Sequence, residues 1–377
     1  MSRRTPAAVG VAVLGLALAG CTSTAPADAG AGGPIAVAAS DDACEVGAAE
    51  AAAGTISFDI TNGGSKVTEF YLYATGGRIM GEVENIGPGL SRQLIVEVPD
   101  GGTYETACKP GMVGDGIRAP FTVTGSAQRT VDTDTRLAEA TAGYARYVNS
   151  QVEALVPKTQ EFVDAVKAGD VEGAKALFPI SRTYWERIEP VAESFGDIDP
   201  RIDGREDDER EPGVAFTGYH RLEKDLWVDG LQADSSAIAD QLMADITELA
   251  GRVPGVELTP VSLANGAKEL LDEVATGKVT GEEDRYSHTD LWDFKANVEG
   301  SQGAIAALRP VLDERDPELG PLLDERFAAL DAVLETYRSG DGFVLYTDLT
   351  PEDVKSLTDA LDALGEPVSQ VAGVVSA

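Results

Sequence analysis

The sequence predicts a two-domain protein in which a small N-terminal β-sandwich precedes a larger all-helical domain. Short apolar runs separated by glycine-rich turns occupy residues 41–126, as in the strands of a sandwich. From residue 135 to 377 the apolar residues instead recur at the spacing of amphipathic helices. A chain of 377 residues also exceeds the size at which one hydrophobic core usually stops growing.

Residues 1–20 have the pattern of a signal peptide. Arg3 and Arg4 precede an apolar run that is too short to span a bilayer comfortably. The run ends in small residues followed by Cys21, which resembles the site where a lipoprotein signal is cut and the cysteine is lipidated. Residues 21–40 are rich in Ala, Gly, Ser, Thr and Pro and predict a flexible spacer. We therefore expect a lipid-anchored protein of the cell envelope, on the outer face of the cell membrane or in the periplasm.

Four apolar or alternating runs predict the strands of the sandwich. Turn signals separate them at residues 62–64, 88–89 and 100–102. The strands are expected at residues 56–60, 69–73, 93–98 and 120–123. This number of short strands fits a small sandwich.

The helical domain begins after Val131 with two amphipathic stretches, whose apolar stripes include Tyr144, Val148, Phe162 and Val166. Further helices are expected at residues 240–252, 262–275, 289–307, 322–338 and 351–364. The last of these has a clear start, because the capping residue Thr350 is followed by a proline and two acidic residues.

The charge balance limits the partners that the chain can bind. The sequence has 64 acidic and 30 basic residues, a net charge of −34. Such a surface repels anionic polymers and attracts cations, so we expect no nucleic-acid partner. Metal ions or a basic protein surface remain as charged partners.

Three short clusters in the helical half contain all three tryptophans and both histidines of the chain, and an acidic stretch at residues 197–209 follows the first. In a protein this poor in aromatic residues, the concentration points to one built site. The clusters are residues 184–190, 218–227 and 281–292.

Two pairs of potential ligands within these clusters share a helix face. Glu186 and Glu189 are three positions apart, as are His220 and Glu223, so each pair can present two ligand atoms to one point. Three carboxylates and one imidazole form an oxygen-rich set that suits ferric iron better than copper or structural zinc. Each pair alone is also typical of a solvated helix face, and it is the clustering that indicates a metal site.

The motif Glu-Glu-Asp-Arg-Tyr-Ser-His-Thr-Asp-Leu-Trp-Asp-Phe at residues 282–294, together with the other clusters, resembles the imelysin-like helical domain of EfeO-type iron uptake lipoproteins. The resemblance covers most of residues 135–377 and implies a double four-helix bundle with the metal between its halves. The tripeptide Asp-Leu-Trp, repeated at 225–227 and 290–292, fits two related bundles.

The resemblance also implies a ligand set. His220 and Glu223 match the family motif His-x-x-Glu, and the family's additional acidic ligands match Glu186, Glu189, Asp203 and Glu283. Their acidic neighbours Asp199, Glu206 and Glu282 remain alternatives in this alignment.

The N-terminal half resembles the cupredoxin-like domain that precedes the helical domain in this family. The run from Cys108 to Met112 is similar to a copper-binding loop, but the domain has no histidine, which excludes a type 1 copper centre. Two alternatives therefore remain for Cys44 and Cys108. They form a disulfide, or they bind copper or another second metal together with ligands among Glu69, Glu82, Glu84 and Met112.

The function expected from this resemblance is that of an iron-binding component of an EfeUOB-type uptake system. It would capture ferric or ferrous iron outside the membrane and deliver it to a membrane permease, with a haem-peroxidase component as a further partner. The alternative is a metal-dependent peptidase of the imelysin-like class. The zinc protease motif His-x-x-Glu-His would need a histidine at position 224, where Lys224 stands.

Overall fold

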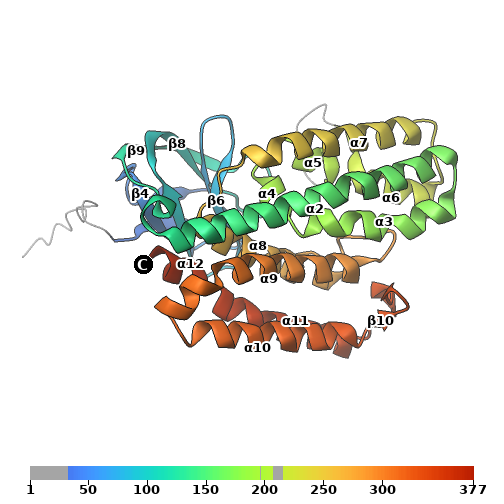
Figure 1. Ribbon diagram of the computed structural model, residues 1–377. Coiled ribbons are helices and arrows are strands. Elements are labelled where there is room, and N and C mark those ends of the chain that lie inside the picture. Colours follow the sequence, from blue (N-terminus) through green and yellow to red (C-terminus); the bar gives the residue numbers. More distant parts are fainter. Residues whose placement is uncertain (1–32, 196, 207–214) are drawn as a thin grey trace, which may run out of the picture.

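The computed structural model describes residues 33–195, 197–206 and 215–377. A β-rich domain lies at one end of the molecule, and the long helices extend away from it (Figure 1). The fold therefore has the predicted order, a β-rich N-terminal domain followed by a helical domain.

The β-rich domain consists of two sheets packed face to face. One sheet has the order β2-β1-β4-β7 and the other the order β3-β9-β8-β5-β6. Phe58 from the first sheet packs against Phe70 and Phe121 of the second, with ring centroids 5.1 and 5.5 Å apart. The strands are β1 (Ile35–Ala39), β2 (Cys44–Val46), β3 (Glu50–Ala52), β4 (Gly54–Asn62), β5 (Thr68–Tyr73), β6 (Ile79–Ile86), β7 (Ser91–Val98), β8 (Asp100–Cys108) and β9 (Ile117–Ser126).

The sandwich begins earlier than the sequence analysis expected. Strand β1 lies within residues 21–40, which were predicted to be a flexible spacer, and it pairs in parallel with β4. Its small side chains resemble those of a linker, yet Val37 and Ala39 are buried. The turn expected at residues 100–102 was also wrong, because these residues begin β8. There, a Cβ on Gly101 would lie 2.4 Å from the carbonyl oxygen of Gly125, so the paired backbones need a glycine.

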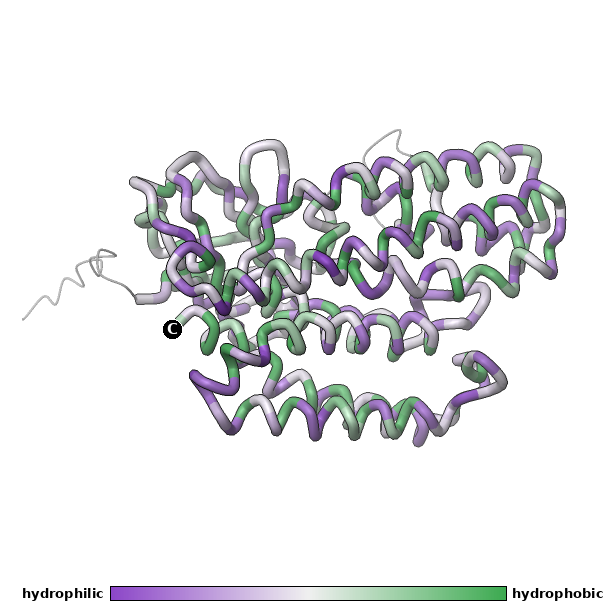
Figure 2. Tube along the Cα trace, in the orientation of Figure 1, coloured by the Kyte–Doolittle hydropathy of each residue, from purple (hydrophilic) through white to green (hydrophobic). Residues whose placement is uncertain are grey.

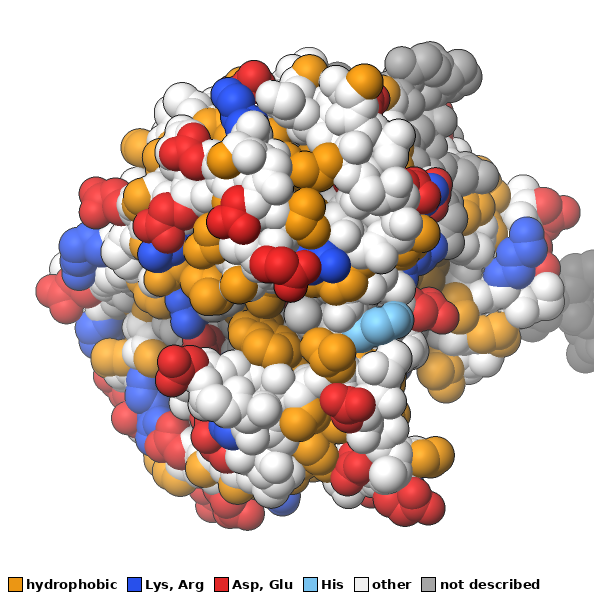
Figure 3. All heavy atoms as spheres, turned by 90° about the vertical axis from the view of Figure 1, so that its right-hand side faces the viewer, with side chains coloured by type: hydrophobic (Ala, Val, Ile, Leu, Met, Phe, Trp, Pro, Cys, Tyr) orange, Lys and Arg blue, Asp and Glu red, His pale blue; other side chains and the backbone are white. Residues whose placement is uncertain are grey.

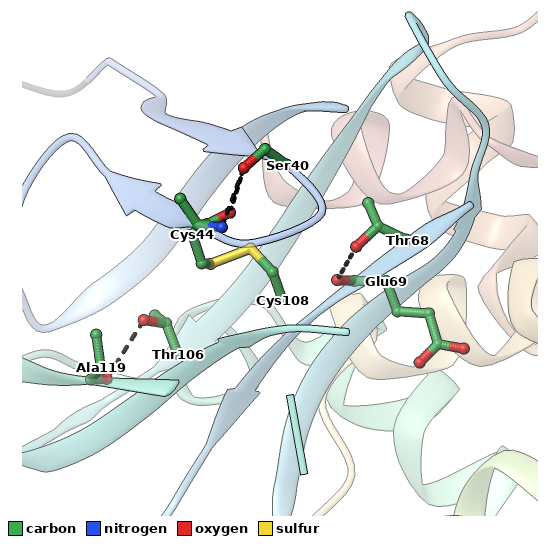
Figure 4. The surroundings of a disulfide bond; sticks show 8 residues. Ser40, Cys44, Thr68, Glu69, Thr106, Cys108 and Ala119 are labelled. Atoms are coloured by element: carbon green, nitrogen blue, oxygen red, sulfur yellow. Dashed lines mark hydrogen bonds between the residues drawn. A yellow bond between two sulfur atoms is a disulfide. The ribbon is translucent and has the colours of Figure 1, made fainter. Parts of the chain in front are cut away.

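Cys44 and Cys108 form a disulfide, with their Cα atoms 5.6 Å apart (Figure 4). It joins β2 of one sheet to β8 of the other. The Glu69 side chain points away from the two sulfur atoms (Figure 4). The disulfide expected as one alternative is therefore confirmed, and the expected second metal site at these cysteines is wrong.

The helical domain buries the apolar stripes predicted from the sequence. Hydrophobic and hydrophilic residues alternate around its helices (Figure 2). Thr350 caps α11 through a hydrogen bond from the backbone N–H of Asp353, as its sequence predicted. The α-helices are α1 (Thr130–Thr133), α2 (Thr135–Ala168), α3 (Val171–Glu186), α4 (Glu189–Glu193), α5 (Asp199–Ile202), α6 (Gly218–Lys224), α7 (Ser235–Arg252), α8 (Pro260–Thr276), α9 (Asp290–Arg315), α10 (Leu319–Glu335), α11 (Pro351–Val368) and α12 (Val371–Ser376).

The helices pack in two neighbouring groups. Helix α2 contacts α3 and α7, whereas α8, α9, α10 and α11 contact one another in a second group, and α9 also packs against α2 and α3. A π-helical turn, η1 (Asp225–Asp229), continues α6, and short 3₁₀ turns include η2 (Val253–Gly255), η3 (Lys278–Thr280) and η4 (Tyr346–Asp348). A small hairpin of β10 (Arg338–Ser339) and β11 (Gly342–Phe343) follows α10.

The sandwich rests on the helical domain through β6 and β7, which contact α8. The amide of Asn265 on α8 donates a hydrogen bond of 3.0 Å to the carbonyl of Ile95 on β7. The carboxylate of Glu97 accepts hydrogen bonds from the N–H and hydroxyl of Thr130 at the start of α1. These contacts place the outer face of β6 against α8.

Within the described residues, no helix is long and apolar enough to cross a membrane. On the end of the helical domain that faces away from the sandwich, acidic side chains are scattered among basic and apolar ones (Figure 3). The predicted lipid attachment at Cys21 and the signal peptide lie outside the described residues and stay predictions.

Candidate metal centre

The second cluster and the acidic stretch meet because two backbone segments approach closely. Gly218 begins α6 with φ +80°, and a Cβ at this position would collide with the carbonyl oxygen of Ile202 at the end of α5. Asp203 directly follows Ile202, and His220 lies two residues after Gly218. The glycine therefore allows the two side chains to face one another.

His220 lies at the centre of the site and is 1% exposed. Its Nε2 atom is 3.4 Å from Oε1 of Glu283 and 3.7 Å from Oδ1 of Asp203. Within the described residues, Nε2 has no hydrogen-bond partner. A buried, unpaired imidazole nitrogen beside two carboxylates is suited to a cation.

Glu223 fixes the other side of the His220 ring. Its Oε2 atom is 3.0 Å from Nδ1 of His220, and its Oε1 atom accepts hydrogen bonds from the backbone N–H groups of Tyr286 and Ser287 at 3.0 and 2.7 Å. A carboxylate on one ring nitrogen directs the other toward a metal, as in many metal sites. Glu223 therefore fixes the orientation of the His220 ring and links it to the third cluster.

Arg182 supplies a positive charge among the acidic residues and is fully buried on α3. Its guanidinium lies within ion-pair distance of five carboxylates, those of Glu186, Asp203, Glu283, Asp284 and Asp293. Oδ1 of Asp284 and Oδ1 of Asp293 still have no hydrogen-bond partner in the described ranges. The single guanidinium group of Arg182 therefore leaves one oxygen of Asp284 and one of Asp293 without a hydrogen bond among the described residues.

Lys278 supplies the second buried positive charge. Its Nζ atom is 3.1 Å from Oε2 of Glu186 and 3.2 Å from Oε2 of Glu189. The amide nitrogen of Asn297 donates hydrogen bonds to the same two carboxylates at 3.2 and 3.0 Å. The predicted glutamate pair therefore lies in the site, with an ammonium group between its carboxylates.

The buried charges shift the protonation of the site. Burial and Arg182 lower the pKa of His220, but the larger opposite effect of Asp203, Glu223 and Glu283 raises this pKa from its usual value to about 10. Burial raises the pKa of Glu186 and that of Glu189 to about 8, although Lys278 lowers both.

Glu283 is held as a carboxylate. Burial raises its pKa, but Lys278, Arg205 and His220 together bring the pKa well below its usual value. An ionised carboxylate next to Nε2 of His220 is ready to bind a cation without first losing a proton.

Three groups of side chains bring ligand atoms within 4.8 Å of one another. All their members are buried. They are Asp203 with His220 and Glu283, then His220 with Glu223 and Asp284, and finally Glu186 with Glu189 and Asp203. A cavity of about 280 Å³ reaches this region and is lined both by helical residues, including Asp203, Glu283 and Glu273, and by Glu82 and Glu84 of β6.

Comparison with known proteins agrees with this arrangement of domains. The imelysin family model matches residues 140–371, and the model of a cupredoxin-like domain matches residues 10–123. The iron uptake system component EfeO of Escherichia coli O157:H7 is 40% identical over 346 residues, which cover 90% of this chain and 91% of that protein. The chain belongs to the EfeO family. The EfeO proteins of Escherichia coli K12 and Shigella flexneri are each 39% identical over the same share of the chain.

A solved structure also resembles this EfeO-family chain. An iron-regulated protein A precursor from Parabacteroides distasonis is 16% identical, with a TM-score of 0.50, and the match covers 64% of this chain and 95% of that one. At this identity the likeness concerns the fold alone.

All six predicted site residues of this EfeO-family chain are buried and lie in one region: Glu186, Glu189, Asp203, His220, Glu223 and Glu283. Among the alternatives, Glu282 and Glu206 are exposed, and Asp199 lines the cavity without belonging to any of the three ligand groups. Residues 207–209 of the acidic stretch lie outside the described residues.

Sequence reasoning missed the basic residues Arg182 and Lys278 and the polar stripe of Asp290, Asp293 and Asn297 on α9. Asp290, Asp293 and Asn297 are fully buried, three and four positions apart, within a helix whose other buried residues are mostly apolar. A polar stripe at helical spacing was the signal that could have identified them. Lys224, which stands where a zinc protease would have histidine, pairs with Glu206 outside the site.

Proposed function

We propose that the chain captures one iron ion in the helical domain, with Asp203, His220 and Glu283 as ligands. The supporting observation is the buried Nε2 atom of His220, which lacks a hydrogen-bond partner in the described part of the chain and faces the other two side chains. Oxygen-rich ligands suit ferric iron. Asp284, whose Oδ1 atom is 4.0 Å from Nδ1 of His220, lies on the Glu223 side of the ring and is not part of the proposed ligand set.

The similarity to EfeO indicates the setting in which this capture occurs. The related proteins are named components of an iron uptake system. We infer that this chain, anchored by a lipid on Cys21, delivers iron to a membrane permease and works with a haem-peroxidase component. We further infer that the two helix groups form the double four-helix bundle expected of the family, because α9 packs against both.

The two histidines of the chain provide a matched test. His220→Asn should abolish tight binding when the mature protein is titrated with ferric citrate. His288→Asn should leave binding intact, because His288 is only partly buried and belongs to none of the three ligand groups. Asparagine also tolerates the φ of +60° at position 288. Iron binding that survives in His220→Asn would refute the proposed site.

A metal-dependent peptidase remains the alternative function. The second histidine of a zinc protease motif is missing, because Lys224 stands at that position and its ammonium pairs with Glu206. His220 is the single histidine of the three ligand groups. Incubating the iron- or zinc-loaded protein with unstructured peptides tests it. Turnover that disappears in His220→Asn would favour the peptidase.

A further inference from the structure

The Lys278 side chain is fully buried at the point where three carboxylates converge. Besides its contacts of 3.1 and 3.2 Å to Glu186 and Glu189, its Nζ atom lies 3.8 Å from Oε2 of Glu273. Burying an ammonium group is costly unless the surrounding charges compensate for its lost hydration. Lysine is also a compact point charge, which makes its ammonium a close substitute for a bound cation.

The surroundings of Lys278 resemble a cation site in their own right. Glu186, Glu189 and Asp203 bring ligand atoms within 4.8 Å of one another without any contribution from His220. Beside them, the Asn297 amide donates to both glutamates, while its Oδ1 atom is buried and has no hydrogen-bond partner in the ranges that the structure covers. An amide flip would turn this unsatisfied oxygen toward the same carboxylates, where a metal ion could use it as a ligand.

Arg182 lies between the Glu186–Glu189 pair and the ligands around His220, while Asp203 belongs to both groups. Its guanidinium contacts Glu186 on one side and Glu283 on the other, so the acidic region contains two neighbouring cation positions. In the structure, Nε2 of His220 has no hydrogen-bond partner among the described residues, whereas the position between Glu186 and Glu189 contains the ammonium of Lys278.

We propose that Lys278 limits the capacity of the centre, because its ammonium lies between Glu186 and Glu189, which together with Asp203 could hold a second cation, so that only one metal ion binds. The ligand class for this second position is a hard cation such as ferric iron, since the atoms available are carboxylate and amide oxygens. The proposal rests on the His220-centred site proposed above for the first ion.

Counting bound ions tests the proposal directly. The full mature protein is loaded with ferric citrate, passed through a desalting column and weighed by native mass spectrometry. The wild type should contain one iron ion per chain and Lys278→Met should contain two. Lys268→Met is the matched control, because Lys268 is on the adjacent helix α8 and pairs with Asp272 away from the site. This control should contain one ion.

A folded Lys278→Met protein that binds only one ion would overturn the proposal. Should that variant fold only when iron is present, the ion count of the folded protein decides, two ions supporting the proposal and one overturning it. Should it fail to fold in either condition, Lys278→Gln, which keeps a polar side chain of similar length without the charge, is counted in the same way: two ions support the proposal and one overturns it.

The two proposals fail in different ways. If the first site is misplaced, His220→Asn retains its iron, whatever the ion count in Lys278→Met. If only the capacity argument is wrong, His220→Asn loses its iron while Lys278→Met still contains one ion.

Discussion

Replacing Glu223 by glutamine should weaken iron binding although the residue need not touch the metal. In the wild type, Glu223 accepts from Nδ1 of His220 and from two backbone N–H groups. A glutamine oxygen can still accept from the backbone of Tyr286 and Ser287, but its amide nitrogen then faces Nδ1 as a donor. This arrangement favours the tautomer with the proton on Nε2, the nitrogen that the metal requires.

The magnitude follows from the cost of restoring the correct tautomer. With Nδ1 protonated for metal binding, two donors face each other in a buried place, and one unsatisfied buried donor costs about 1–3 kcal/mol. At about 1.4 kcal/mol for each tenfold change, iron affinity should fall about 5- to 150-fold. Loss of an outer-shell partner of a metal ligand typically costs a similar 10- to 100-fold.

Competition between the protein and a chelator for iron measures this loss. Glu282→Gln is the control, because it removes the same charge from an exposed neighbour of Glu283. Both variants are compared at low and high salt, since salt screens exposed charges but has little effect on buried ones. Equal affinities in Glu223→Gln and Glu282→Gln, or a difference that disappears at high salt, would refute the positioning role of Glu223.

Three further predictions concern pH and the disulfide. Iron affinity should fall by up to about tenfold per pH unit as the pH decreases from about 8 to 6, because iron must displace a proton from His220, whose pKa is raised to about 10; a flat profile by calorimetry would argue against His220 as a ligand. The metal-free protein should lose stability as the pH rises from about 6.5 toward 10. The raised pKa of His220 stabilises the folded state fully at pH values below the pKa of an unfolded histidine, and this stabilisation is lost as the pH passes the pKa of about 10 in the folded state. A melting temperature that rises over this range would contradict the prediction. Replacing Cys44 and Cys108 together by serine should lower the free energy of unfolding by up to about 4 kcal/mol, because the disulfide closes a loop with a sequence separation of 64; iron affinity should not change, and a parallel loss would tie the sulfur atoms to metal binding.

Local patterns predicted two pairs of site residues three positions apart. His220 and Glu223 share one face of α6, as the spacing predicted. The common helix face expected for Glu186 and Glu189 was wrong, because Glu186 ends α3 and Glu189 begins α4, and the two carboxylates meet across the break between these helices. The choice of Glu283 over Glu282 needed the family resemblance, since both are acidic and adjacent. Lys278 could not be assigned, because its partner Glu189 is 89 positions away and a buried lysine looks like any surface lysine in sequence.

The strands show the same limit. Strand β4 was predicted from its alternating pattern, and the structure places its apolar residues in the core between the sheets. Strand β6 was missed because it carries Glu82 and Glu84 on the face that packs against the helical domain, so no apolar alternation marks it. Burial against a second domain is a property of the whole fold and leaves no local periodicity.

The cavity shared by the two domains bears on the speed of loading. A cation that diffuses into it meets Glu84 on the sandwich, whose pKa burial raises to about 7 so that it ionises near neutral pH, as well as the ionised Glu283 on the helices. Long-range attraction of this kind accelerates encounter, whereas close contacts such as those around His220 determine how long the ion stays. The small domain can therefore influence the association rate of iron while contributing no ligand to the final complex. Substitutions on β6 would then change the kinetics of capture and leave the residence time of the ion almost untouched.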